Sequence, residues 1–519
     1  MNKNIYFTTY IIIATLSLVA CDKFLDVKPA GKLTPEKGDV IAFDRLLNNS
    51  ATISSTFQRA NDGTTPLTYL TNNIEVSDNQ ANYSWGSGTG NTELFFAHIF
   101  QLPYGNPGSM DESWNNGVYR AAEYFNIVID GVNEVRTPEV ERQANETIAQ
   151  ATVARAWGYF FASLGYGPVY KPGGDNSRKV LPYRTASSVM APMEELSTMQ
   201  EIFDRVLSEV HGVLRHIPEM ASSNTRFGKA QTYAFLAEYH LFTHKFDSVA
   251  YYSDKALELA AAQQGGLENL FFDMNQFSWS NQAAVDENPD LRVGNNATIV
   301  SPQGQVTETM HRENCLYRAP TLGGVSGAMS YPTAEFLALF ESTDLRTEYY
   351  IFEYISTVPN IPAGVPNDGR RVQNYQTKFG RTNGYSYPEL LLMRAESRAR
   401  TGNTSGALSD LNYLRRFRHT PDALPLNITN PDALVQEVLN ERRRELAAAS
   451  PKHCFDLKRL CLDSGKPWGK TSVTHTVKGV PYTADIDSEY FILPIKNPIL
   501  KYNPQWGISL DSRPWSSVP

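Results

Sequence analysis

Two stretches of the sequence place aromatic side chains beside amide side chains, a combination that suits sugar binding. The residues are Tyr83, Trp85, Phe277, Trp279, Asn281 and Gln282. A flat ring stacks on the C–H groups of a pyranose, and neighbouring amides hydrogen-bond its hydroxyls. Each residue alone is also compatible with core packing. We expect Trp279 to be a solvent-facing platform, with Trp85 second, because the aromatics around it follow no helical period and buried amides would each need a partner.

Carboxylates are the other candidates for chemistry. Four of them stand close together in the sequence, namely Asp273, Asp286, Glu287 and Asp290. A glycosidase needs two carboxyl groups at a defined separation, which an aperiodic stretch does not specify. The sequence has no G-x-S-x-G, H-E-x-x-H or Cys-x-x-Cys motif, and its 9 His residues are scattered. It therefore predicts no catalytic residue, no metal site and no cofactor, with a glycan-cleaving enzyme kept as an alternative.

Three consecutive arginines, residues 442–444, lie in a segment with helix signals. Asn430 suits the N-cap position, and apolar residues recur at helical spacing up to Leu446. Consecutive helix residues point about 100° apart, so the three guanidinium groups cannot all reach open solvent. We expect Arg442 to point inward and to pair with the carboxylate of Asp456. A solvated run of charges is the alternative.

The composition is that of an ordinary folded protein. With 41% hydrophobic and 20% charged residues, a chain of 519 residues forms two or three domains, or one superhelix built from repeats. The net charge of −8 argues against binding to a phosphate backbone. Nucleic acid is therefore not an expected partner.

The N-terminus has the pattern of a lipoprotein signal peptide. Lys3 precedes an apolar run over residues 11–20, too short to span about 30 Å of hydrocarbon. The run ends in Leu-Val-Ala before Cys21, as in bacterial lipoproteins whose cysteine is acylated. We expect cleavage after residue 20 and membrane anchoring through Cys21. The other cysteines are expected to be buried, unpaired thiols, namely Cys315, Cys454 and Cys461.

Helical periodicity predicts a series of antiparallel hairpins. Segments 114–135 and 141–164 form the first, and an amphipathic helix follows at 199–217. Segments 226–262 and 386–418 each carry a hairpin with tetratricopeptide-like spacing. Small or apolar residues recur at equal offsets in the two, with Ala395, Ala407 and Leu414 matching Ala237, Val249 and Ala256. Any packed helical hairpin places small residues there, so an unrelated pair of hairpins is the alternative.

Two stretches lack such a period. Residues 82–108 combine Gly and Asn with Tyr83, Trp85 and Tyr104, and are expected to be irregular with exposed aromatics. Residues 265–386 are rich in Gly, Pro, Asn and Ser and are longer than an ordinary connection. Such insertions are commonly functional.

Six dispersed motifs resemble those of the SusD/RagB family, the nutrient-binding outer-membrane lipoproteins of Bacteroidetes. The most specific are the C-terminal motif, ERRREL at 441–446 followed by FDLKR at 455–459, and the helical text at 390–418. Further matches stand at residues 22–29, 155–169, 335–346 and 490–506. Residues 451–454 depart from the family text, which there carries a Gly and an Arg-Trp pair. The resemblance covers essentially the whole chain after residue 20.

The resemblance implies a mostly α fold in which tetratricopeptide-like hairpins form a right-handed superhelix supporting a loop-rich ligand-binding face. It also implies a surface-exposed outer-membrane lipoprotein that captures an oligosaccharide without cleaving it. The implied partner is a SusC-like TonB-dependent transporter. RagB-like members serve peptide import, so a peptide is the alternative ligand, and a scaffold that binds only other proteins is a further alternative. Binding positions vary in the family, so none of the aromatic and amide candidates is taken from a motif.

We divide the chain accordingly. The expected parts are a signal peptide at 1–20, an N-terminal helical region at 21–265, a loop-rich insert at 266–385 and a C-terminal region at 386–519.

Overall fold

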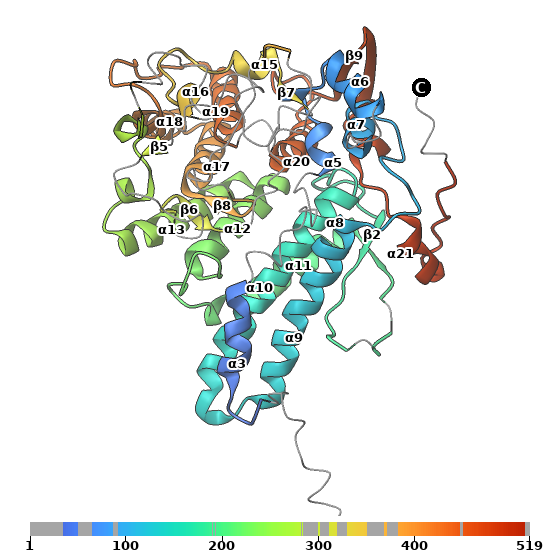
Figure 1. Cartoon of the computed structure of the whole chain (residues 1–519). Coiled ribbons are helices and arrows are strands. Elements are labelled where there is room, and N and C mark those ends of the chain that lie inside the picture. The colour runs from blue at the N-terminus through green and yellow to red at the C-terminus, as the bar shows by residue number, and fades with distance from the viewer. Residues whose placement is uncertain are drawn as a thin grey trace, which may run out of the picture.

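The structure is a computed structural model, and it is mostly helical (Figure 1). The residues that it describes are 35–49, 65–86, 92–188, 190–192, 194–281, 283, 299–300, 311–318, 330–349, 368–370, 382–446 and 450–513. Among them, no helix is both long enough and apolar enough to cross a bilayer.

The first predicted hairpin is confirmed. Helix α9 (Arg120–Val135) follows a short π-helical segment and packs along α10 (Glu141–Tyr166), with the turn η3 (Pro138–Val140) between them. Helix α11 (Met199–Val213) packs on α10 and begins with a capping box between Thr198 and Glu201. Together with α3 (Val40–Asp44), these helices form the lower part of the molecule in Figure 1.

The two repeat-like hairpins are also present, and they stack on each other. Helix α12 (Lys229–Phe242) pairs with α13 (Phe246–Gln264), and α17 (Tyr387–Arg400) pairs with α18 (Thr404–Arg418). Helix α13 packs on α17, although the whole loop-rich insert lies between them in sequence. The six residues at the matching positions are all fully buried. The common register therefore corresponds to a common packing role.

Helix α19 (Pro431–Leu446) packs on α17 and carries the three arginines. Its first turn is capped by Asn430, whose Oδ1 accepts from the amide of Ala433 at 2.9 Å. Helix α20 (Pro451–Leu460) begins after Ser450, which caps it in the same way. Arg442 points inward and pairs with Asp456, with 2.7 Å between Nε and Oδ2, so the predicted ion pair is confirmed.

Strands are short and occur in pairs. The described pairs are β1 (Ile74–Glu75) with β7 (Tyr331–Pro332), β2 (Lys179–Pro182) with β3 (Leu196–Thr198), β4 (Ser278–Trp279) with β5 (Ile299–Val300), β6 (Asn314–Leu316) with β8 (Tyr385–Ser386), and β9 (Ser472–Val477) with β10 (Val480–Asp485). The remaining short helices include α5 (Pro66–Tyr69), α6 (Asp78–Gly86), α7 (Thr92–His98), α15 (Ala334–Leu337), α16 (Arg346–Tyr349) and α21 (Asn497–Tyr502).

Residues 82–108 differ from the sequence-based expectation. Helices α6 and α7 occupy much of this stretch, and Tyr104 is 1% exposed rather than solvent-facing. The reason is packing, because Leu94, Phe95 and Phe96 on α7 join the main core, where α7 contacts α5.

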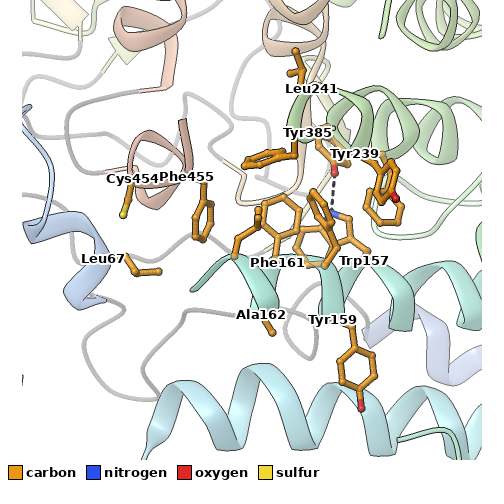
Figure 2. Close-up of a cluster of buried hydrophobic side chains, with 14 of the residues drawn as sticks. Leu67, Trp157, Tyr159, Phe161, Ala162, Tyr239, Leu241, Tyr385, Cys454 and Phe455 are labelled. Carbon is orange, nitrogen blue, oxygen red and sulfur yellow. Dashed lines mark hydrogen bonds between the residues drawn. The ribbon is translucent and has the colours of Figure 1, made fainter. Parts of the chain in front are cut away.

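The core joins segments from both halves of the chain (Figure 2). Trp157 and Phe161 extend from α10 toward Tyr239 of α12, Tyr385 of β8 and Phe455 of α20. The indole N–H of Trp157 donates to the hydroxyl of Tyr385 at 3.1 Å. The three cysteines are buried and unpaired, as expected. The division into four parts remains a prediction.

Candidate ligand-binding face

The sequence-predicted site residues fall in two separate places. Tyr83 lies on α6, whereas Phe277, Trp279 and Asn281 lie in and around β4. In Figure 1, α6 is at the upper right and β5, the partner of β4, is at the upper left, so the structure does not bring the two groups together. Gln282 and the side chain of Trp85 lie outside the described residues.

Trp279 is buried, and the prediction of a solvent-facing ring is therefore wrong. Only 3% of it is exposed, and its indole N–H donates to Oε1 of Glu348 at 2.9 Å. Its ring lies 5.8 Å from that of Tyr349 on α16. The physical reason is the alternation of a β-strand, which directs Ser278 and Ser280 to solvent and Trp279 inward. Ser278 and Ser280 therefore remain in contact with water although the indole ring of Trp279 is buried.

The neighbours of Trp279 are less enclosed. Phe277 is half-buried, with its ring edge-on to Tyr349, whose hydroxyl donates to the carbonyl of Phe277 at 3.1 Å. Asn281 is exposed. This group can offer polar atoms and one partly accessible ring at the surface.

Helix α6 is held firmly at its N-terminus. Ser77 and Gln80 exchange hydrogen bonds between side chain and backbone, at 3.0 and 3.1 Å, in the manner of a capping box. The carboxylate of Asp368 accepts from the side chains of Ser77 and Asn79. Burial alone would raise the pKa of Asp368, but these hydrogen bonds outweigh it and lower that pKa. The carboxylate is thus a stable anchor for the helix.

A second layer of contacts joins this anchor to the strand pair β1–β7. The guanidinium of Arg370 lies 4.6 Å from the centre of the Tyr331 ring and pairs with Glu75. Glu75 and Tyr331 are opposite each other in the strand pair. Helix α6 therefore projects from a rigid base and presents Asn82, which is exposed, and Tyr83, which is half-buried.

Sequence reasoning missed a hollow between α9, residues 184–187 and α21. Its volume is about 560 Å³, and Tyr119, Glu123, Arg184 and Tyr502 are among its lining residues. Tyr502 is 85% exposed at the end of α21. No periodicity or composition signal distinguishes this tyrosine from its neighbours in the sequence.

The described residues contain no group of three or more His, Cys, Asp or Glu placed to hold a metal ion. Of the four candidate carboxylates, Asp273 caps the short turn η6 (Met274–Gln276) by accepting from the amide of Asn275 at 3.0 Å. Asp286, Glu287 and Asp290 lie outside the described residues. Of these four candidates, the one within the described structure thus serves to cap a helical turn.

The chain matches two protein-family models. Residues 23–241 match a family described as starch-binding, associating with the outer membrane, and residues 357–505 match the SusD family. The chain belongs to the SusD/RagB family. Both matches contain motifs that the sequence analysis singled out, including those at 155–169 and 390–418.

Relatives of this SusD-family chain support the assignment over most of its length. A SusD-like protein, P38, of Formosa agariphila is 21% identical over 496 residues, covering 86% of this chain and 89% of the relative. A SusD superfamily protein of Bacteroides thetaiotaomicron superposes with a TM-score of 0.61 at 14% identity, covering 91% of this chain and 98% of that one. A SusD-like carbohydrate binding protein of Bacteroides vulgatus has a TM-score of 0.55 at 14% identity, with 91% and 97% covered. These structures share the fold, which confirms the predicted class of tetratricopeptide-like helical hairpins.

Proposed function

We propose that this SusD-family protein is a surface-exposed, lipid-anchored outer-membrane protein that binds an oligosaccharide and delivers it to a SusC-like TonB-dependent transporter. The observation that carries the proposal is the pair of family matches, one of which is described as starch-binding and outer-membrane associated. The junction before Cys21 supports the anchor.

Binding without turnover is the role that the described site chemistry supports. The ionised groups around α6 are engaged with one another, as in the pairing of Arg370 with Glu75 and the anchoring of Asp368. Such groups fix a surface in place, whereas a glycosidase needs an acid and a base directed at one glycosidic bond.

We propose the exposed side of α6 as the place where the saccharide binds, with Tyr83 and Trp85 as the stacking residues. The rigid base under α6 supports this choice, because a preorganised platform loses little conformational entropy on binding. Phe277, Asn281 and Gln282 are proposed as additional contacts only for a ligand long enough to reach the surface around β4. Trp279 is buried and is therefore not proposed as a ligand contact.

The direct test of function is calorimetric titration of the protein with oligosaccharides and, separately, with peptides of similar size. Saccharide binding, with the glycan recovered intact, is the expected result. Binding of peptides alone would replace this proposal with the RagB-like alternative, and shortened glycan would identify an enzyme.

A further inference from the structure

A polar cavity lies between helices α19 and α20 and the segment 467–470, apart from the proposed saccharide site on α6. Its volume is about 240 Å³. Its buried lining includes Arg442, His453, Asp456 and Trp468, whereas Glu335 and Lys470 at its edge are exposed. The cavity is therefore open to solvent at one side and charged at its floor.

The floor contains a guanidinium group with unused hydrogen-bonding capacity. Nε of Arg442 donates to Asp456 at 2.7 Å, and its Nη2 lies 3.1 Å from Oε1 of Glu389. Its Nη1 is buried without a hydrogen-bond partner in the part of the chain that the structure describes. Because this atom has almost no accessible surface, it does not face the cavity, and a ligand there would meet the cations at the edge instead.

The edge of the cavity carries an excess of positive charge. Arg443 and Lys470 both reach one carboxylate oxygen of Glu335, at 3.3 and 3.0 Å. The other bonds of Arg443 go to the neutral Oδ1 of Asn73, at 2.6 and 3.0 Å. Two cations thus share one anion here. Arg442 below them pairs with Asp456 and Glu389, which also pair with Arg459 and Lys452.

The remaining walls suit a sugar ring. The amides of Gln436 and Asn440 line the cavity and bond to each other at 2.9 Å, and hydroxyl groups of a ligand can extend this pair. Leu439, Leu457 and Leu460 supply an apolar wall for C–H groups.

We infer that this cavity binds the carboxylate of a sugar acid, with the carboxylate directed at Arg443 and Lys470 and the ring against Gln436, Asn440 and the leucine wall. The preference for a carboxylate follows from the two cations at the edge, which share the single carboxylate of Glu335. The choice of a sugar as its carrier rests on the proposed function.

The test is titration of the full-length protein with glucuronate and with galacturonate, beside glucose and an N-acetylated dipeptide. We expect at least one uronate to bind more tightly than glucose and the dipeptide, with an affinity that falls as salt is added. The same titrations are repeated with Arg443→Gln, Lys470→Gln and Lys466→Gln.

Lys466 is a matched control for Lys470. Their side chains are 47% and 43% exposed, each pairs with a carboxylate at about the same distance, and only Lys470 lines the cavity. Uronate affinity should fall about tenfold or more in Arg443→Gln and about threefold in Lys470→Gln, and it should be unchanged in Lys466→Gln. Thermal melting of each variant confirms that it is folded.

Two results would overturn the inference. One is that neither uronate binds at concentrations up to about 20 mM, in which case the cavity holds solvent alone. The other is that the dipeptide binds and the uronates do not. If the protein binds a uronate in this cavity but binds no oligosaccharide at α6, the proposed function is contradicted and this site is not. The failure of the proposed function and the failure of this inference are therefore distinguishable.

Discussion

Arg459 on α20 donates to both carboxylate oxygens of Glu396 on α17, at 2.7 and 2.9 Å, and all of these atoms are buried. Its Nε also donates to Asp456 at 2.7 Å, and Asp456 in turn accepts from Arg442 on α19. A chain of alternating charges therefore connects three helices through the core. Burial alone would raise the pKa of Asp456, but the guanidinium groups of Arg442 and Arg459 lower it to about 2.

Replacement of Asp456 by Ala should destabilise the protein by about 3 to 5 kcal/mol, because it leaves Arg442 and Arg459 buried with too little negative charge. Denaturant unfolding measures the loss. The control is Asp432→Ala, which removes an exposed partner of Lys466 and should change stability little. A parent-like stability of Asp456→Ala would show that the network does not stabilise the fold.

Glu238 on α12 should make the stability depend on pH near neutrality. Burial raises its pKa from 4.5 to about 7, and one of its carboxyl oxygens has no hydrogen-bond partner among the described residues. The unfolded chain therefore loses this proton at lower pH than the folded chain does. As the pH rises from about 4.5 to about 7, the contribution of this group should lower the free energy of unfolding by on the order of 3 kcal/mol. Above about pH 7 its contribution should stay constant.

The variant Glu238→Gln should lack this component. Its melting temperature should exceed that of the parent at pH 8, with the difference vanishing toward pH 4.5. Glu258→Gln, at an exposed position on α13, serves as the control. Parallel pH profiles for Glu238→Gln and the parent would contradict the assignment.

Because Trp279 is buried, its replacement should lower stability as the replacement of a core residue does. Trp279→Ala removes a buried ring and leaves Glu348 without its indole donor, so it should cost about 3 to 5 kcal/mol in unfolding free energy. Trp279→Phe keeps a ring and should cost less. If instead Trp279→Ala melts at the same temperature as the parent and binds saccharide much more weakly, the ring is exposed and contacts the ligand.

Much of the helical scaffold can be predicted from the sequence because helix caps and apolar periodicity are local patterns. The cap at Asn430 and the apolar period up to Leu446 define α19, and three adjacent arginines at about 100° intervals require an inward member. Similarly, the spacing of small residues in 226–262 and 386–418 reflects close helix packing within each hairpin.

The site could not be read in the same way, because its geometry depends on long-range pairing. Glu75 meets Tyr331 only through a strand pair of two residues per strand, too short to leave a period in the sequence. The orientation of Trp279 likewise follows from two strand residues. The cavity beside Arg442 requires α15, α19 and α20 to be placed together, which no local pattern specifies.

Anchoring should depend on Cys21. The variant Cys21→Ala cannot carry the acyl chains expected at this position, so it should appear in the soluble fraction when it is expressed without the proposed transporter. Membrane fractionation measures this outcome, with the parent protein, which keeps Cys21, as the reference. Membrane association of the variant at the level of the reference would place the anchor elsewhere.

The most direct measurement of the central claim is the affinity of α6 variants for the oligosaccharide that the parent binds. Tyr83→Ala and Trp85→Ala should each weaken binding by about thirtyfold, as expected for a central aromatic contact. Tyr251→Ala removes an exposed tyrosine on α13, remote from α6, and should bind like the parent. Parent-like affinity in both α6 variants, with melting temperatures unchanged, would contradict saccharide capture on α6.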